Sequence, residues 1–219
     1  MLNAAIPEAQ VQARSASRAQ GEFRTLTSAE RPLLRDHLLR LTPDDRALRF
    51  LSEVGVDHIE QYCSRVDDHY RIVVGYFFDG VMRGAGEIVF NVGPTWLGGC
   101  EVALSVERAS QNGGVGYELL RRLLVLARNR GVIKVRMLCL RGNQRMQRLA
   151  KKFDSELHFI AGDVEGTLYP RWPDAASLLE ESWQHGCAML NLVFGLAAPA
   201  TTVGNEKPVS ISHSAFIVD

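Results

Sequence analysis

The chain has 219 residues, of which 46% are hydrophobic and 23% are charged, so it is long enough to bury one full core. Lysine plus arginine number 25, as do aspartate plus glutamate, and this balance gives no bias towards nucleic acid or an anionic membrane surface. No window approaches the ~20 apolar residues of a membrane span. We therefore expect neither a nucleic-acid partner nor a membrane partner.

Three regions differ in composition. Residues 1–20 are rich in Ala, Gln, Ser and Arg and lack the apolar block of a secretory signal, so we expect a flexible N-terminal arm. Ordered patterns begin near Phe23 and predict one folded domain over 21–170. Residues 171–219 are predicted to form a C-terminal helix followed by a mobile tail.

The first half of the domain predicts a strand, three helical segments and a hairpin. "FRTLT" favours a short strand, and "ERPLLRDHLLRLTPDDRALRFL" favours two helices, the second of which begins at Pro43. "VDHIEQYCSRV" is a third helical segment. "YRIVVGYFFDGVMRGAGEIVFNVG" holds two β-rich runs around Asp79 and Gly80, a dipeptide typical of two-residue hairpins.

The second half begins with the strand "CEVALSVE" and a glycine-rich loop. A helix follows from Val115 to Arg130, with an apolar face and with most of its charges, Glu118, Arg121, Arg122 and Arg128, on the other face. "KVRMLCL" predicts a strand, "NQRMQRLAKKF" a short helix, "ELHFIAG" and "EGTLYPR" two closing strands, and "PDAASLLEESWQHGCAMLNLVF" a late helix. The element order predicts an α+β fold with a mixed, mainly antiparallel sheet.

The loop "QNGGVG" joins a strand directly to a helix. Gly113, Gly114 and Gly116 allow successive backbone N–H groups to turn inward, and the start of the helix adds unpaired donors, so the pattern favours a phosphate site. No lysine follows Gly116, which disfavours a Walker A loop, and the spacing is not that of a dinucleotide fingerprint. On the loop alone, a flexible connection without a ligand is an equal alternative.

Two segments resemble one known family. "QNGGVG" fits the Q/R-x-x-G-x-G/A signature of the GNAT superfamily of acyl-CoA N-acyltransferases, and "EVALSVERASQNGGVG" is similar without a gap to its bacterial protein-lysine acetyltransferase branch. "LTPDDRALRF" also resembles a segment of that branch, and the likeness covers about residues 23 to 170. The resemblance implies a central sheet with splayed middle strands, flanked by helices, and acetyl-CoA as co-substrate.

The resemblance also implies the cofactor-binding residues. The thioester would meet backbone groups at Leu104, Ser105 and Val106, and the CoA pyrophosphate would meet the loop and the first helical turn. That segment consists of Gln111, Asn112, Gly113, Gly114, Val115, Gly116 and Tyr117. Asn143 matches an asparagine near the pantetheine arm, and it is an equally good helix N-cap.

Glu101 matches the family's catalytic glutamate, the general base that deprotonates the acceptor amine. The alternative for Glu101 is a solvated carboxylate at a strand end or the partner of an arginine. Glu107 is the second candidate carboxylate. Two departures from the family's pattern stand out: Ala150 replaces a tyrosine acid, and Asn112 with Gly113 replaces the usual small and basic pair.

Other reactive residues predict little chemistry. The cysteines, which form no CxxC pair, are Cys63, Cys100, Cys139 and Cys187, and this usage suits reduced thiols in a cytoplasmic protein. The histidines show no metal-binding spacing, so we predict no metal. Trp172 and Trp183 are interpreted as packing anchors of the late helix or as a contact in a homodimer.

The main hypothesis is an N-acetyltransferase that acts on a primary amine, either a protein lysine or a small amine. A non-catalytic CoA-binding sensor or interaction module is the alternative, because the tyrosine is missing and the loop is altered. A structural scaffold that binds no CoA is the third interpretation.

Overall fold

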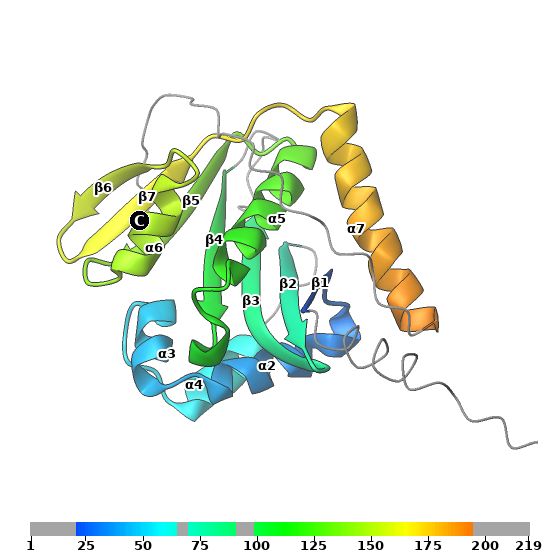
Figure 1. The fold of residues 1–219 in the computed structure, drawn as a ribbon. Helices are drawn as coiled ribbons and strands as arrows, with labels where there is room; N and C mark the ends of the chain where they lie inside the picture. Colours follow the sequence, from blue (N-terminus) through cyan, green and yellow to red (C-terminus); the bar gives the residue numbers. More distant parts are fainter. Residues whose placement is uncertain (1–20, 65–69, 91–98, 195–219) are drawn as a thin grey trace, which may run out of the picture.

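The computed structural model describes residues 21–64, 70–90 and 99–194. The predicted arm over 1–20 and the tail after the late helix lie outside the described residues. The predicted boundary between 170 and 171 falls in the connection between the last strand and the last helix. Figure 1 shows a central sheet with helices on both of its faces.

The sheet has seven strands in the order β1-β2-β3-β4-β5-β7-β6. The strands are β1 Glu22–Thr25, β2 Arg71–Phe78, β3 Val81–Phe90, β4 Gly99–Val106, β5 Lys134–Leu140, β6 Glu156–Ile160 and β7 Asp163–Leu168. Every neighbouring pair is antiparallel except β4 and β5. The predicted mixed and mainly antiparallel sheet is confirmed.

Helices cover the two faces of this sheet. They are α2 Arg31–Arg40, α3 Pro43–Phe50, α4 Val56–Ser64, α5 Val115–Asn129, α6 Gln144–Lys151 and α7 Ala175–Phe194. Helices α2, α3 and α4 lie on one face, and α5 and α6 lie on the other. Helix α7 lies beside α5 and β1. Two short 3₁₀ turns, Ser28–Glu30 and Arg108–Ser110, precede α2 and follow β4.

Alternating strand residues divide the core into two clusters. On β3, Ile88 packs towards α5 with Val102 of β4, whereas Ala85 packs towards α2 and α4 with Leu38 and Ile59. This alternation follows from the period of two in a strand, and it leaves both faces of the central strands covered. The sheet can therefore hold side chains of opposite character on its two faces.

Local sequence signals placed two turns correctly. The β2–β3 turn has positive φ at Asp79 (50°) and Gly80 (74°), as a two-residue hairpin with two left-handed positions requires. Pro43 occupies the first turn of α3, and Thr42 caps that helix by accepting a hydrogen bond from the Asp45 N–H at 3.2 Å. These two turns determine where β3 and α3 begin.

One prediction for α5 is wrong. Glu118 and Arg122 were placed on the charged outer face, yet each is only 9% exposed. Arg122 Nε donates to Glu118 Oε1 at 2.8 Å, and its guanidinium lies 5.0 Å from the ring of Phe23 in β1. The reason is tertiary: β1 and α7 cover this side of α5, which periodicity alone does not reveal.

The three cysteines whose side chains the structure describes differ in burial. Cys100 and Cys139 are buried, and burial raises the pKa of the Cys100 thiol to about 12. Cys63 is only half-buried, and burial raises its pKa to about 11. The side chain of Cys187 is outside the described part of the structure.

Candidate active site

Strands β4 and β5 pair over only three residues and then diverge. The parallel pairs are Gly99 with Lys134, Cys100 with Val135 and Glu101 with Arg136. Beyond them, β4 stays paired with β3 through Val106, and β5 stays paired with β7 through Leu140. Figure 1 shows the two strands moving apart towards the glycine loop. We call this unpaired part of β4 and β5 the splay.

The register of β4 shows which backbone groups face the splay. The Glu107 N–H donates to the Arg83 carbonyl at 2.9 Å, so the N–H groups of alternate residues back along β4 also point towards β3. The N–H groups of Leu104 and Val106 therefore point towards β5. Consistent with this direction, the Val106 carbonyl accepts a hydrogen bond from the Gln111 side-chain amide at 2.8 Å.

This geometry removes Ser105 from the predicted donor set. Its backbone N–H faces Ala85 of β3, and its hydroxyl lies 2.9 Å from His37 Nε2 while the residue is 8% exposed. Ser105 thus helps to hold α2 on the sheet. Leu104 and Val106 remain as the two predicted donors whose N–H groups point into the splay.

The glycine loop forms an open turn in front of α5. Asn112 and Gly114 have left-handed φ values of 65° and 81°. A Cβ added at Gly113 or Gly114 would meet no atom within 4 Å, so the space beside the loop is open. The N–H groups in the first turn of α5 have no intrahelical acceptor, and they carry the positive end of the helix dipole. The loop can therefore receive an anion.

Helix α6 lies against this loop. Arg145 donates to the Gln111 side-chain carbonyl, and the Tyr117 ring stacks on Phe153 with centroids 4.7 Å apart. A Cβ at Gly116 would lie 3.7 Å from a methyl group of Leu149, which is an ordinary contact. Arg145 thus brings a cation to a loop that lacks one in its own sequence.

Asn143 caps α6, and Ala150 packs into the core near the end of the same helix. The Asn143 side-chain oxygen accepts a hydrogen bond from the Met146 N–H at 3.1 Å, so it acts as the N-cap. Ala150 is 2% exposed and belongs to the core beside α5.

Glu101 occupies the last paired position before the splay. Its side chain points to the face of α2, α3 and α4, as does that of its parallel neighbour Arg136. Within the described residues, the Glu101 carboxylate accepts no hydrogen bond and forms no ion pair, and Arg136 is likewise without an ion-pair partner. The alternative in which an arginine neutralises Glu101 finds no support in these contacts.

Glu107, the second candidate, is bound on all sides. Arg40 Nε and Arg83 Nη1 each donate to it at 2.9 Å, and His37 Nδ1 lies 3.3 Å away. Burial opposes ionisation, but the hydrogen bonds from His37, Arg83 and Arg40 outweigh it and lower the pKa of this carboxyl to about 2. An acid this strong is a poor base at neutral pH, so Glu107 is structural.

A third carboxylate, Glu87 of β3, is 1% exposed and was not identified from the sequence. Arg49 forms an ion pair with it, Tyr62 donates to it at 2.9 Å, and Arg71 lies 3.2 Å away. Burial and the charge of Glu87 raise the pKa of Tyr62 to about 12. The cluster joins α3 and α4 to the sheet, and no local pattern signals it because its members are far apart in sequence.

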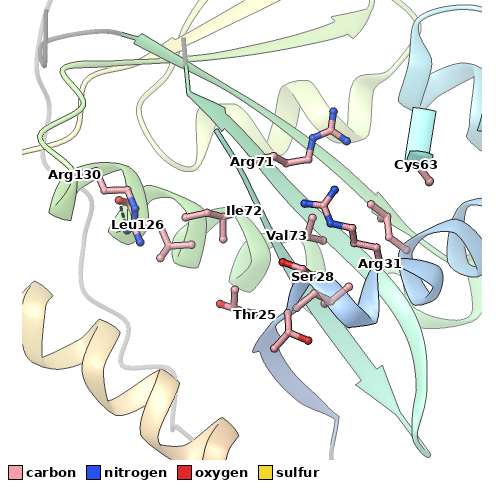
Figure 2. A pocket seen from close by; sticks show the side chains of 12 residues that line it. Thr25, Ser28, Arg31, Cys63, Arg71, Ile72, Val73, Leu126 and Arg130 are labelled. Atoms are coloured by element: carbon pink, nitrogen blue, oxygen red, sulfur yellow. Dashed lines mark hydrogen bonds between the residues drawn. The ribbon is translucent and has the colours of Figure 1, made fainter. Parts of the chain in front are cut away.

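A separate pocket of about 350 Å³ lies at the edge where β1 meets β2. Figure 2 shows its lining, which includes Arg31 of α2, Arg71 of β2 and Arg130, the residue after α5. None of the predicted site residues lines this pocket, so we assign no part of the acyl-transfer site to it.

No group of three His, Cys, Asp or Glu side chains in the described part of the chain could hold a metal ion. No described helix is long and apolar enough to cross a membrane.

A splayed sheet, an open glycine loop before a helix and an unpaired carboxylate at the point of divergence are compatible with an acyltransferase that uses a phosphate-bearing acyl carrier. Residues 34–154, more than half of the chain, match the model of the acetyltransferase (GNAT) family, and the chain belongs to that family. The predicted resemblance is confirmed. The protein is therefore an acetyltransferase with acetyl-CoA as co-substrate.

Solved structures with the same fold include the GNAT domain of S. lividans PAT, which has a TM-score of 0.58 and 19% sequence identity and matches 67% of this chain and 89% of that one. An N-acetyltransferase from Staphylococcus aureus Mu50 has a TM-score of 0.52 and 15% sequence identity, and the match covers 69% of this chain and 99% of that one. RimL, a ribosomal L7/L12 alpha-N-protein acetyltransferase in complex with coenzyme A, has a TM-score of 0.52 and 15% sequence identity. That match covers 68% of this chain and 93% of the other. A search of curated proteins finds no match.

Proposed function

We propose that this protein transfers an acetyl group from acetyl-CoA to a primary amine, with Glu101 as the general base. The observation that carries the proposal is the position of Glu101. It is an unpaired carboxylate at the last β4–β5 pair, beside the splay where the acyl group would lie. The neighbouring carboxylates Glu87 and Glu107 are held by arginines, so neither is available as a base.

The glycine loop and the splay would give acetyl-CoA two points of attachment. The pyrophosphate would bind the loop from Gln111 to Gly114 and the N–H groups of Val115, Gly116 and Tyr117. The thioester carbonyl would accept a hydrogen bond from the Leu104 or Val106 N–H. A donor aimed at this oxygen stabilises the negative charge that develops on it in the transition state.

The reaction then proceeds by direct transfer. The acceptor nitrogen attacks the thioester carbonyl carbon, a C–N bond forms, and the C–S bond breaks as the tetrahedral intermediate collapses. Glu101 takes one proton from the nitrogen, directly or through a water, and the CoA thiolate leaves. Since Ala150 cannot donate a proton, solvent protonates the thiolate, whose ordinary pKa near 8.5 makes it a tolerable leaving group.

A base matters most for an amine that is protonated at neutral pH. A lysine-like amine with a pKa of about 10.4 is neutral in about one molecule in 2,500 at pH 7, a handicap of roughly 4.6 kcal/mol. The likeness to protein acetyltransferases supports a protein lysine as acceptor, and a small amine fits the same chemistry.

A non-catalytic CoA-binding module is the second candidate, favoured by Ala150 and by the altered loop. Turnover of a panel of primary amines, followed by CoA release, separates the two functions. We expect Glu101→Gln to lower kcat about 10²- to 10⁴-fold at pH 7 and less at pH 10, where the amine is increasingly neutral. Glu60→Gln, at an exposed position of α4, serves as the control.

An unchanged pH profile in Glu101→Gln would remove Glu101 from the mechanism. Acetyl-CoA binding without turnover of any amine in the wild-type protein would favour the sensor.

We also propose that α7 pairs with α7 of a second copy, which takes up the homodimer interpretation of Trp172 and Trp183. The helix turns its polar side inward: Ser177 donates to the Asn129 side chain at 2.7 Å, and Arg130 contacts Glu181 at 3.0 Å. Its outer side exposes Leu179 (70%) and Trp183 (65%). An amphipathic helix with its apolar side outward needs a cover.

The sequence of α7 favours a second helix as that cover. Ala176, Leu179, Trp183 and Gly186 follow the 3-4 spacing of a helix-pairing seam. The outer face carries no charge between Ala175 and Gly186, so two copies can meet without like-charge repulsion. A standard interface needs roughly 800 Å² per partner, of which each buried tryptophan supplies about 150–250 Å².

Sedimentation velocity across a range of concentrations tests this pairing. We expect a dimer for the wild-type protein and a monomer for Leu179→Glu. Phe159→Glu, an exposed apolar position on β6, should keep the dimer. A wild-type monomer at all concentrations would contradict the proposal.

A further inference from the structure

Helix α3 extends over β4 beside the open end of the splay. Near its start, Asp45 accepts a hydrogen bond at 2.8 Å from Arg108, which follows β4. Near its end, Arg49 is paired with Glu87, the cross-strand neighbour of Ala103. The helix contacts both β4 and β5. Residues between Asp45 and Arg49 that face the sheet therefore lie near the part of β4 that borders the splay.

Arg46 is such a residue. It lies three residues before Arg49 and four before Phe50, so the three side chains share one face of the helix. Arg49 and Phe50 are directed to the sheet and α4, where Arg49 pairs with Glu87 and Phe50 makes an edge-to-face contact with Tyr62. Arg46 thus points to the same side, one turn nearer to the glycine loop.

Arg46 has no partner of its own. Its Nε is buried without a hydrogen bond, and its guanidinium forms no ion pair or hydrogen bond within the described residues. The two terminal nitrogens are not among the buried unpaired atoms, so each of them keeps some exposed surface. A partly buried guanidinium without a partner is costly for the free protein, because its desolvation is not offset by any contact.

The phosphates of CoA are not the ligand that would satisfy it. The anion loop and the start of α5 lie on the opposite face of the sheet from α3. Among the described residues of α3, β4 and β5, the charged side chains on this face without an ion pair are one carboxylate, Glu101, and three cations, Arg46, Lys134 and Arg136. This set complements a substrate that carries a carboxylate close to its reacting amine or to its acyl group.

We propose that Arg46 binds a carboxylate of the substrate and so selects for it, a statement that rests on the acyltransferase function proposed above. The guanidinium fork matches a carboxylate in two parallel hydrogen bonds. The carboxylate belongs either to the amine acceptor, as in a free amino acid, or to a dicarboxylic acyl group. Arg46 is a specificity residue, while Glu101 keeps the role of base.

Matched substrate pairs test the proposal. In the first arm, acetyl-CoA is the donor, and glycine and lysine are compared as acceptors with glycinamide and lysinamide. In the second arm, the amides are the acceptors, and succinyl-CoA is compared as donor with acetyl-CoA. We expect a preference for the carboxylate member in one arm, and Arg46→Gln should lower kcat/KM for that member about 10- to 100-fold. The other member should change less than twofold, and Arg46→Lys should give an intermediate loss.

Binding controls keep this test separate from the acyltransferase proposal. Acetyl-CoA affinity should be the same in Arg46→Gln, in the wild-type protein and in Arg35→Gln, whose arginine pairs with Asp36 on the outer side of α2. Calorimetric titration of the same amino acids and amides into CoA-saturated protein, and of both acyl-CoAs into the free protein, reports carboxylate binding without turnover.

Carboxylate-dependent binding that Arg46→Gln abolishes, without turnover, would contradict the proposed enzyme and support the Arg46 site. The Arg46 proposal would be overturned if Arg46→Gln lowered kcat/KM equally for both members of each pair. It would also be overturned if the wild-type protein showed no preference for the carboxylate member in turnover or in binding.

Discussion

Glu87 and Glu101 lie on adjacent strands and on the same face of the sheet, yet their surroundings are opposite. Glu87 pairs across the strands with Ala103, two residues from Glu101. Its carboxylate is 1% exposed and meets Arg49, Arg71 and Tyr62, whereas the Glu101 carboxylate meets no such partner among the described residues. Helices α3 and α4 close the sheet over Glu87, while Glu101 stands where β5 diverges.

This difference separates charges that hold the fold from charges available for chemistry. Removing one partner of a buried ion pair lowers the free energy of unfolding by more than the pair itself contributes, because the remaining charge is left buried without a counter-ion. An unpaired carboxylate beside an open edge contributes little to the free energy of unfolding, so it can be replaced without unfolding the protein. The same test distinguishes Glu107, which is bound by Arg40 and Arg83, from Glu101.

The largest expected effect is on stability. Glu87→Gln leaves Arg49 buried without its counter-ion and should lower the free energy of unfolding by about 3–5 kcal/mol. Glu101→Gln should change it by no more than about 0.5 kcal/mol. Urea denaturation followed by circular dichroism measures both values. A similar loss in the two variants would show that Glu101 is also a structural charge.

The next effect concerns the anion loop. Gly114 has a φ of 81°, a conformation that costs an L-residue roughly 1–2 kcal/mol, and more when the residue is β-branched. Gly114→Val should therefore weaken acetyl-CoA binding about tenfold or more. Gly55→Val is the control, because a Cβ at Gly55 meets open space and its φ is not left-handed. Retained affinity in Gly114→Val would place the pyrophosphate elsewhere.

The smallest effect is a pH dependence of stability. Hydrogen bonds from His37, Arg83 and Arg40 lower the pKa of Glu107 from its ordinary value of 4.5 to about 2, against the effect of burial. Its contribution is therefore present above about pH 4.5 and is lost as the pH falls towards 2. In Glu107→Gln the free energy of unfolding should fall less between pH 6 and pH 3 than in the wild-type protein. An equal fall would contradict the pairing.

Much of the fold could be predicted because its signals are local. Asp79 and Gly80 specify a hairpin, Pro43 marks a helix start, and three glycines between a strand and an apolar helix mark an open loop. The position of Glu101 also came from a contiguous stretch. What the sequence indicated best was thus the order of elements and the loop that joins β4 to α5.

The rest depends on contacts between distant residues. His37 and Glu107 are 70 positions apart, and Arg49 and Glu87 are 38 apart, so no spacing pattern joins them. The burial of Arg122 follows from β1 and α7, which are far apart in sequence but contact each other beside α5. The direction of the Ser105 N–H towards β3 likewise follows from the β3–β4 register, which no local pattern in the sequence reveals.

The central claim is that Glu101 serves the reaction and neither the fold nor CoA binding. Its most direct test is calorimetric titration of acetyl-CoA into the wild-type protein and Glu101→Gln, with turnover of the best amine measured on the same samples. We predict equal affinities, within about twofold, and a large loss of turnover in Glu101→Gln. Weakened acetyl-CoA binding, or unchanged turnover, in that variant would contradict the account.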